Sequence, residues 1–387
     1  MLKENLITAP YVFSAQHENH CYYYRLDLSK KQRNYIMATP LIEWLLSFFM
    51  RVKSLNEALM NQNNFSVVEI KEAVLKLRSI NFLLSSDDLV IHVPTLELEI
   101  TNACNAKCLM CPRDKIRSIG IMKEDIFSRV EILLKEAKLP GVILQGIGEP
   151  SLHRSLISWV KRMRVALPDG APIVMVTNGF NLNSMYLAQL REAGISLIQW
   201  SLHSAEKNTY NKIMGIDKFD QVNRNLQSCI REHGDIISIN FVVMQNNFHE
   251  IDDFKIWIKN LGLPENRLGL IEVQSRGGSL NISDLIINKK EIFRQGRCLF
   301  IKKSLFIAWN GDILPCSNDI SGNHVQGNIK NINPNGLIKL WRDHLLSQSP
   351  KFKICESCDH YARNTLETEW FKLIRKKPVI SGKQRIM

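Results

Sequence analysis

The chain has 387 residues, 45% hydrophobic and 23% charged, and carries a formal net charge of +12 at pH 7. These proportions are those of a globular protein, and the length predicts two or three domains. The first residues lack the apolar segment of a secretory signal, and the longest apolar run, Leu45 to Met50, is too short to cross a bilayer. We therefore expect a cytoplasmic protein with no membrane contact, in which clustered cysteines indicate metal binding or catalysis and not disulfides.

The positive net charge allows three interpretations. Basic residues are spread along the chain and are not gathered in a stripe interleaved with aromatic residues, which argues against nucleic acid as a partner. Positive charge would equally attract an acidic peptide or an acidic electron donor, such as a flavodoxin or a ferredoxin. The third interpretation is a basic surface without a specific partner.

Residues 1–92 predict a small module of strands and helices. Two aromatic-rich, alternating segments, Tyr11–Phe13 and Cys21–Leu28, predict a pair of strands. Three helical patterns follow over residues 41–83, and the second and third begin after the candidate N-caps Ser54 and Ser66. The segment from Leu84 onwards predicts a turn into a strand, in the manner of a wing.

Residues 93–115 predict a strand that runs into a cysteine-rich loop. Leu96, Leu98 and Ile100 alternate with Glu97, Glu99 and Thr101, which is typical of a half-buried strand. The loop carries three thiols in eight residues, Cys104, Cys108 and Cys111. Soft thiolates select iron–sulfur clusters, zinc or cuprous copper. A four-iron cluster normally takes four cysteines, so three would leave one iron open to another ligand. A structural zinc loop, with Asp114 or a distant histidine as fourth ligand, is the alternative.

The spacing C-x3-C-x2-C after Glu-Ile-Thr-Asn resembles the signature of radical S-adenosylmethionine (SAM) enzymes. In that family the open iron binds the amino and carboxylate groups of SAM. One electron then cleaves SAM to methionine and a 5′-deoxyadenosyl radical, which abstracts a hydrogen atom from the substrate. The residue before the third cysteine is usually aromatic in the family, and here it is Met110.

Residues 93–285 alternate strand and helix patterns, which predicts a parallel α/β fold. Amphipathic patterns such as residues 156–167 and 222–234 separate the strands. Six βα units fit the partial (β/α)6 TIM barrel of the radical SAM family, whose active site lies at the carboxyl ends of the strands. The predicted strands are residues 96–101, 142–147, 172–176, 197–202, 236–244 and 268–273.

Several strand ends carry candidate SAM-binding residues. The segment Gln145-Gly-Ile-Gly-Glu-Pro150 resembles the family's Gly-Gly-Glu-Pro segment, whose glutamate accepts a hydrogen bond from the SAM amino group. A glycine-rich turn with a solvated glutamate is the alternative. The family often places a serine near the SAM ribose, as Ser201 would be here. For His203 we favour a structural histidine over a proton relay. The candidates implied are Gly146, Gly148, Glu149, Pro150, Asn178, Ser201, His203 and Met244.

Residues 276–290 predict a linker, after which a second cysteine group begins. Phe306 to Leu314 predicts a hairpin with an Asn-Gly turn, and a helix is expected around residues 337–344. Four thiolates can close a four-iron cluster completely, whereas a zinc ribbon usually has two short cysteine pairs and this chain has one. The four residues are Cys298, Cys316, Cys355 and Cys358.

This second group resembles the Twitch form of the SPASM extension of radical SAM enzymes. The resemblance implies one auxiliary cluster that takes or relays an electron, in enzymes that act on peptides or small alcohols. The module at residues 1–92 resembles the winged-helix recognition elements of enzymes that mature ribosomally made, post-translationally modified peptides (RiPPs). Those elements bind a leader peptide as an added strand. A structural cap or a DNA-binding winged helix is the alternative.

The sequence therefore predicts an α/β protein with three domains: a winged-helix-like domain (1–92), a partial barrel (93–285) and a small iron–sulfur domain (286–387). It predicts SAM and two [4Fe–4S] clusters as cofactors. The expected activity is the cross-linking, epimerisation or oxidation of a precursor peptide at an unactivated carbon, with electrons from a flavodoxin or ferredoxin. The alternatives are a radical SAM dehydrogenase of a small alcohol or sugar and, more remotely, a zinc-stabilised DNA-binding protein. No side chain outside the motifs stands out as a catalytic acid or base.

Overall fold

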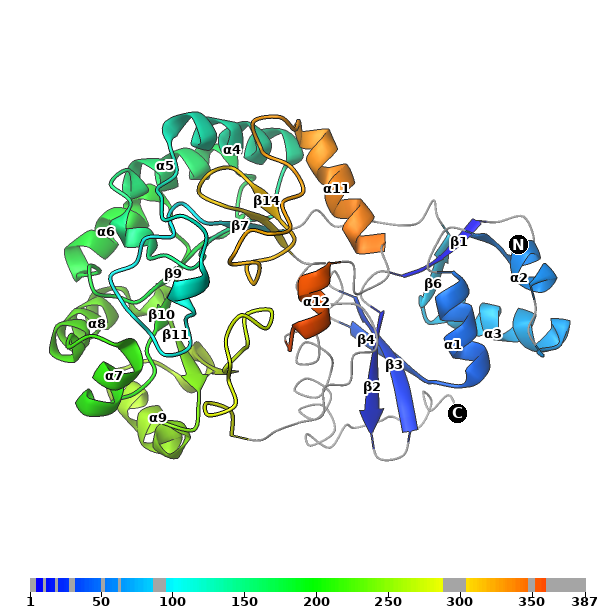
Figure 1. Ribbon diagram of the computed structural model, residues 1–387, viewed down its shortest axis with the longest axis horizontal. Coiled ribbons are helices and arrows are strands. Elements are labelled where there is room, and N and C mark those ends of the chain that lie inside the picture. Colours follow the sequence, from blue (N-terminus) through cyan, green and yellow to red (C-terminus); the bar gives the residue numbers. More distant parts are fainter. Residues whose placement is uncertain are drawn as a thin grey trace.

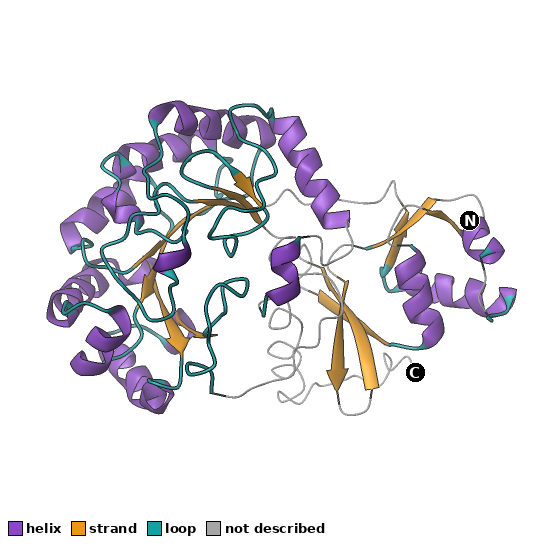
Figure 2. Ribbon diagram, viewed as in Figure 1, coloured by secondary structure: helices purple, strands orange, loops and turns teal. Residues whose placement is uncertain are grey.

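The computed structural model describes residues 5–9, 12–17, 20–27, 32–49, 53–61, 64–85, 95–287, 304–346 and 352–359. An N-terminal module lies at one end of the molecule, and a curved half-ring of strands with helices outside them forms the other end (Figures 1 and 2). The helix α12 (Lys353–Ser357) lies between the two in this view.

The N-terminal module is built on three helices, α1 (Pro40–Phe48), α2 (Leu55–Met60) and α3 (Val67–Ser79). Ser54 and Ser66 cap α2 and α3 as predicted, and each forms a capping box with the glutamate three residues later. The helices pack on a three-stranded antiparallel sheet of order β5-β1-β6, with a core of its own around Leu45, Phe49 and Phe82. Its strands are β1 (Asn5–Thr8), β5 (Lys53–Ser54) and β6 (Leu83–Ser85).

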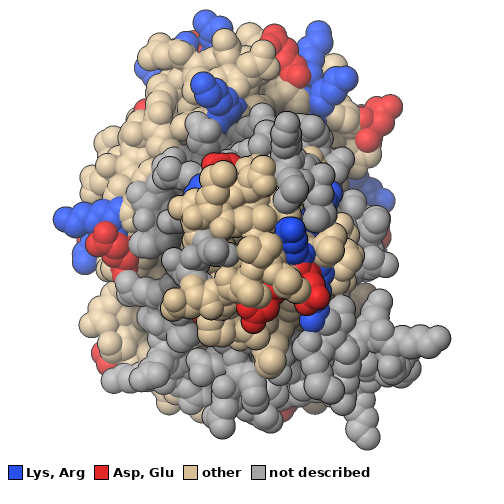
Figure 3. Space-filling view, turned by 90° about the vertical axis from the view of Figure 1, so that its right-hand side faces the viewer, with Lys and Arg blue, Asp and Glu red and all other residues tan. Residues whose placement is uncertain are grey.

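A second antiparallel sheet has the order β2-β3-β4, with strands Val12–His17, His20–Asp27 and Gln32–Met37. The predicted strand pair is confirmed, but the third strand, β4, was missed because its first residues are polar and give no alternation. The predicted turn at Leu84 is wrong, since Leu84 and Ser85 belong to β6 and pair with β1. The rest of the predicted wing, residues 86–92, lies outside the described residues. On the face that this end presents, basic side chains are scattered among acidic ones (Figure 3).

The large sheet has the order β12-β11-β10-β9-β8-β7-β13-β14 and stays open. Its first six strands pair in parallel, so all six predicted strands are confirmed, each close to its predicted bounds. They are β7 (Thr95–Leu98), β8 (Val142–Leu144), β9 (Ile173–Thr177), β10 (Leu197–Ser201), β11 (Ile237–Val243) and β12 (Leu268–Glu272). The connecting helices are α4 (Glu124–Ala137), α5 (Leu156–Ala166), α6 (Ser184–Ala193), α7 (Lys207–Met214), α8 (Phe219–His233) and α9 (Ile251–Asn260). This is the predicted partial barrel.

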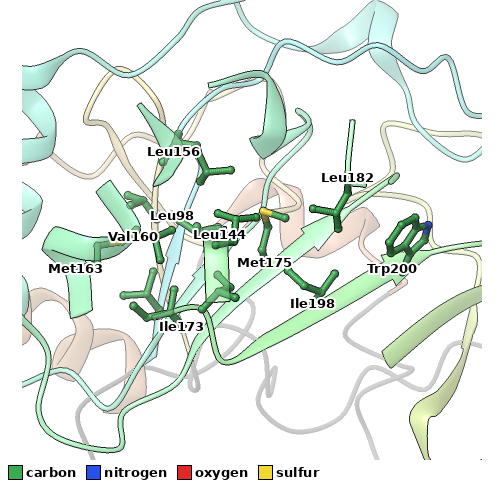
Figure 4. Packing of buried hydrophobic residues seen from close by; sticks show 14 of the residues in the cluster. Leu98, Leu144, Leu156, Val160, Met163, Ile173, Met175, Leu182, Ile198 and Trp200 are labelled. Carbon is green, nitrogen blue, oxygen red and sulfur yellow. The ribbon is translucent and has the colours of Figure 1, made fainter. Parts of the chain in front are cut away.

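The core of the barrel lies between the sheet and its outer helices. Alternate strand residues such as Leu98, Leu144 and Met175 face Val160 and Met163 of α5 (Figure 4). Each is almost fully buried, and burying one such side chain stabilises the fold by about 1.5–3 kcal/mol. The apolar stripes of the helices and the period of two in the strands therefore account for this layer.

The opposite face of β7 is more deeply buried than the sequence predicts. Glu97 and Glu99 were expected on the exposed side of a half-buried strand, yet their relative exposures are 3% and 1%. Their face is turned to the inside of the barrel, where C-terminal residues cover it. The hairpin of β13 (Ser304–Ile307) and β14 (Ile313–Leu314) provides part of this cover, because β13 pairs in parallel with β7.

The C-terminal segment thus extends the barrel sheet instead of forming a layer of its own. The predicted hairpin is confirmed, and Gly311 in its turn has φ +86°, a conformation that suits glycine. The predicted helix is α11 (Pro334–Leu346), and its Leu337 and Trp341 belong to the barrel core beside α4. The domain boundary at 285/286 stays a prediction.

Replacement of Gly120 by alanine should destabilise the contact between the barrel and this hairpin. A Cβ at Gly120 would overlap the ring of Trp309, and such overpacking costs about 1–3 kcal/mol. Gly234→Ala is the control, since Gly234 has φ −60° and its nearest neighbour would lie 3.6 Å from the added Cβ. We expect urea unfolding to show a loss for the first variant and no loss for the second. Equal stabilities would contradict this packing.

Candidate functional site

The three cysteines of the first group lie on one loop at the carboxyl end of β7. Cys104, Cys108 and Cys111 are all partly buried. Burial, together with the neighbouring thiols of Cys111 and Cys104, raises the pKa of Cys108 to about 12. The thiols therefore lie close to one another, and a metal would have to displace their protons on binding.

The donor set fits a cluster better than a single ion. Among the described residues, no three His, Cys, Asp or Glu side chains converge on one metal ion. A four-iron cluster does not need such a point, because each cysteine binds a different iron. Asp114, the alternative zinc ligand, is exposed on the one-turn helix η1 (Arg113–Lys115). Three grouped soft donors without a fourth fit a four-iron cluster with one open iron.

The cysteine loop is hydrogen-bonded to the end of α7. Lys107 N donates to Met214 O (3.0 Å), and Leu109 N donates to Ile213 O (2.9 Å). Met110, the residue that is usually aromatic, is buried in a small apolar cluster that also contains Met244. Of the predicted cofactor residues, Met244 is therefore fully buried and forms part of the wall beneath the loop.

Glu149 is buried next to the same loop. Its carboxylate accepts hydrogen bonds from Asn178 N (2.7 Å), Thr177 Oγ1 (2.8 Å) and Ser151 N (3.1 Å). Burial raises the pKa of Glu149, and the hydrogen bond from Asn178 N opposes this rise. Because a carboxylate accepts about four hydrogen bonds, one position is left for a ligand donor such as an ammonium. At 2% exposure, Glu149 does not fit the alternative of a solvated glutamate.

Two further predicted residues join Glu149 to the cysteine loop. Asn178 Nδ2 lies 3.9 Å from Cys104 Sγ and donates to Asn105 Oδ1 (2.7 Å). A Cβ on Gly148 would overlap the carbonyl oxygen of Thr101, just ahead of the cysteines. Pro150 begins the short helix η2 (Pro150–Leu152), in which Glu149 caps the first turn. The structure thus brings Gly148, Glu149, Asn178 and Cys104 together.

The remaining candidates lie apart from this contact. Ser201 is partly exposed at the end of β10. His203 is buried, its Nδ1 accepts from Val242 N (3.1 Å), and burial lowers its pKa to about 4. Its ring is therefore neutral at pH 7 and bonded to β11, which fits a structural histidine. A Cβ on Gly146 would overlap the carboxylate of Glu99, so this glycine makes room for Glu99.

A buried ion pair beside the site had no signal in the sequence. Arg117 Nη2 pairs with Glu99 Oε1, and Arg117 Nη1 donates to Ile320 O (3.1 Å). Glu99 Oε2 accepts from Ile147 N (3.1 Å) in the Gly-Glu-Pro segment. The Arg117 guanidinium opposes the rise in pKa that burial imposes on Glu99. This pair connects the cysteine loop, the Glu149 loop and the segment after Cys316.

The second cysteine group is described in part. Cys316 follows β14, and Cys355 and Cys358 belong to α12 and its end; Cys358 is buried. Cys298 lies outside the described residues. Asp359 accepts from Ser275 N (3.0 Å) and Ser275 Oγ (2.6 Å), so the start of the predicted linker is fastened to the cysteine segment. In the described part of the chain, no helix is long and apolar enough to span a membrane.

Comparison with known families agrees with this architecture. Residues 98–258 match the Radical SAM superfamily, and residues 298–360 match SPASM, an iron–sulfur cluster-binding domain. An open parallel barrel with cysteines at its carboxyl edge is the arrangement expected of the first. The chain therefore carries a radical SAM domain and, C-terminal to it, a SPASM domain. Its cofactors are SAM, a [4Fe–4S] cluster in the radical SAM domain and an auxiliary iron–sulfur cluster in the SPASM domain.

Curated relatives cover only part of the chain. It is 33% identical over 185 residues to the probable GTP 3′,8-cyclase of Saccharolobus solfataricus, a match that spans 47% of this chain and 58% of that protein. The GTP 3′,8-cyclase of Cronobacter sakazakii is 30% identical over 188 residues, 47% of this chain and 55% of that protein. The matches thus span little more than half the length of these relatives.

Solved structures share the fold at low sequence identity. Streptococcus suis SuiB bound to the precursor peptide SuiA has a TM-score of 0.53 and 14% identity, and the match covers 92% of this chain and 94% of that one. Native anSMEcpe with bound AdoMet has a TM-score of 0.52 and 14% identity, and the match covers 73% of this chain and 98% of that one.

Glu99→Gln should strongly destabilise the protein, because it leaves the buried Arg117 guanidinium without a counter-charge. Breaking a buried pair in this way costs about 3–5 kcal/mol. The control is Glu124→Gln, which breaks the exposed pair of Glu124 with Arg162 and should cost at most about 1 kcal/mol. Urea unfolding of both variants measures the difference, and similar losses would refute the central role of the buried pair.

His203 should make stability depend on pH in the acidic range. The unfolded chain takes up a proton near pH 6.5, whereas the folded chain resists protonation until about pH 4. Stability from this group is therefore complete above pH 6.5 and is lost as the pH falls towards 4, by about 3 kcal/mol. Urea unfolding of the cluster-free protein at several pH values should show this loss in the wild type and a smaller one in His203→Asn. Parallel profiles would contradict the burial of a neutral ring.

Proposed function

We propose that the chain is a radical SAM enzyme that modifies a ribosomally synthesised precursor peptide. The observation that carries this proposal is the N-terminal module in front of the barrel. The match to SuiB extends over 92% of the chain, whereas the match to anSMEcpe covers 73%. A radical SAM domain that acts on a small molecule has no evident need for a module of this size.

The construction of the module supports binding of a leader peptide. In the described part of the chain, β2 and β4 each pair with one strand only, as the two edges of a three-stranded sheet. An edge strand can accept an extended peptide through its backbone groups. We propose that residues 1–92 bind the leader in this way and thereby deliver the core peptide to the barrel.

The proposed roles of the site residues follow from their contacts. Cys104, Cys108 and Cys111 would hold the SAM cluster, and Cys298, Cys316, Cys355 and Cys358 the auxiliary cluster. Glu149 would accept the SAM ammonium, with Gly148, Asn178 and Ser201 around it. Gly146, Pro150, His203 and Met244 would support the pocket from outside. Bound SAM would supply a radical that abstracts a hydrogen atom, and an auxiliary cluster would accept the electron that the resulting substrate radical loses on oxidation.

A second candidate function is the transformation of GTP, which the 33% identity to a probable GTP 3′,8-cyclase favours. That identity extends over 47% of the chain only. The third candidate function is that of a dehydrogenase of a small alcohol or sugar. The radical SAM match argues against the zinc-stabilised DNA-binding alternative. We further propose a cytoplasmic location and a flavodoxin or ferredoxin as electron donor.

Iron analysis should find two four-iron clusters per chain. After anaerobic reconstitution we expect about eight irons and eight sulfides in the wild type and about four of each in Cys104→Ala/Cys108→Ala/Cys111→Ala. The control is Cys229→Ala, at a buried cysteine in α8, which should keep all the iron. About four irons together with one zinc in the wild type would instead make the SPASM domain of this chain a zinc site.

Binding of the substrate peptide can be tested with synthetic peptides that correspond to the short open reading frames beside the gene. We expect one of them to bind the reconstituted full-length protein saturably in fluorescence anisotropy and to undergo a SAM-dependent mass change. Its scrambled version should do neither. GTP, tested in the same assays, should neither bind nor react. Turnover of GTP without binding of any peptide would transfer the proposal to the second candidate.

A further inference from the structure

Two buried carboxyl groups at the end of β7 differ in their partners. Glu97 lies in β7 and Glu99 directly follows it, and both point to the same inner face, since side chains alternate along an extended chain. Glu99 is bonded to Arg117 and to Ile147 N. Glu97 Oε2 is equally inaccessible to solvent but has no hydrogen-bond partner. Both oxygens of Glu99 are thus satisfied, whereas one oxygen of Glu97 is not.

A buried carboxyl oxygen without a partner weakens a fold and calls for an explanation. Burial raises the pKa of Glu97, and hydrogen bonds with the side chains of Ser304, Gln145 and Ser317 oppose this rise, yet Oε2 itself has no partner. The fold would be better served by an amide or an apolar side chain here. Departures of this kind from the stability optimum are characteristic of functional positions.

Arg276 is the matching unpartnered donor. It follows β12 and has φ +50°, a left-handed conformation that is uncommon for a bulky residue. The turn is fixed by the bond from Ser279 N to Arg276 O (3.2 Å) and by the bonds of Ser275 to Asp359. The Arg276 guanidinium makes no hydrogen bond or ion pair with any residue that the structure describes.

Arg276 lies near both Glu97 and the cysteine loop. Its positive charge lowers the pKa of Glu97 and also that of Cys111. The inner face of the barrel beside the predicted SAM site therefore holds an unused acceptor and an unused donor close together. Strain and missing partners at two adjacent charged side chains are expected of a binding site before its ligand arrives.

The inner face is open enough for a ligand to reach this pair. The inward residues of the neighbouring strands are partly exposed, and the terminal carboxyl bond of a glutamate rotates easily, so that Oε2 can turn towards the lumen. The partly exposed inward residues are Ile143, Gln145, Val174, Val176, Gln199 and Ser201.

We propose that Glu97 and Arg276 form a substrate subsite inside the barrel that holds one peptide group, with Glu97 accepting its N–H and Arg276 donating to its carbonyl oxygen. This inference rests on the proposed peptide substrate. A peptide group fits because it offers a donor and an acceptor side by side without net charge. A nucleoside triphosphate would pair with Arg276 but would bring no N–H donor to Glu97 Oε2 through its phosphates, and a cation would be repelled by Arg276.

The first test compares the stability of Glu97→Gln with that of Glu99→Gln in the reconstituted full-length protein. The matched pair shares face, burial and chemical change. We expect the melting temperature of Glu97→Gln to equal or exceed that of the wild type, because a buried carboxyl with an unpartnered oxygen is removed, and that of Glu99→Gln to fall. A fall in Glu97→Gln similar to that in Glu99→Gln would make Glu97 a structural residue and overturn the proposal.

The second test is a double-mutant cycle between the protein and the peptide that binds it in anisotropy. Each backbone amide near the modified residue is N-methylated in turn, and binding is measured to the wild type, Glu97→Leu, Arg276→Leu and the surface control Glu124→Gln. We expect one methylation and Glu97→Leu each to weaken binding about tenfold or more. Their combination should weaken it no further, since the methylation removes the donor and Glu97→Leu the acceptor of the same hydrogen bond.

The outcomes separate this inference from the proposed function. If no peptide binds the wild type, the peptide function fails, and the peptide subsite fails with it. If a peptide binds but every methylation adds its full effect in Glu97→Leu, the function stands and the subsite is refuted. Binding by Glu124→Gln equal to that of the wild type is required for either conclusion.

Discussion

The arrangement of the site depends on one buried ion pair, that of Glu99 with Arg117. Buried charges are tolerated only when they are paired and hydrogen-bonded, so both side chains have one acceptable geometry. Around this pair meet β7, the loop that follows the cysteines, the Gly-Glu-Pro segment through Ile147 N, and the segment after Cys316 through Ile320 O. Protein contacts thus connect the loop that follows Cys111 with the segment that follows Cys316.

The same ion pair also fixes the backbone around the predicted SAM pocket. Because Glu99 holds Ile147 N, the backbone on either side of Ile147 is fixed, with Gly146 close to Glu99 and Gly148 close to Thr101. Glu149 is then directed towards Thr177 and Asn178, which in turn reaches Cys104. Preorganisation of this kind lets a ligand bind without paying for the ordering of the loop.

The sequence was informative where the signal is local. The six parallel strands, the amphipathic helices and the N-caps Ser54 and Ser66 all follow from patterns within a few residues of each other. The pairing of β13 with β7 could not be predicted, because nothing in either segment specifies a partner so far away in the chain. The same pairing explains why Glu97 and Glu99 were misplaced. Alternation identifies the polar face of a strand but not whether another segment covers it.

The candidate site shows the same division. Spacing identifies Cys104, Cys108 and Cys111 and the Gly-Glu-Pro segment, because in each case the residues that act together are also close together in the sequence. The three hydrogen bonds to Glu149 come from Ser151 and from residues on another strand, and no pattern marks Arg117 as a partner of Glu99. Contacts of this kind depend on tertiary structure and leave no local periodicity.

Glu97 and Glu99 together show what separates a structural from a functional carboxyl group. Residue type, face and burial are the same for both, so none of these properties can assign a role. Only the partners differ: the surrounding structure supplies Glu99 with a guanidinium and a backbone N–H, and leaves Glu97 Oε2 without any. A chain selected for stability alone would have replaced Glu97, because removing a buried oxygen that lacks a partner is easier than building a partner for it. Its presence beside Arg276, whose guanidinium makes no bond with a described residue, is best explained by a ligand that completes both.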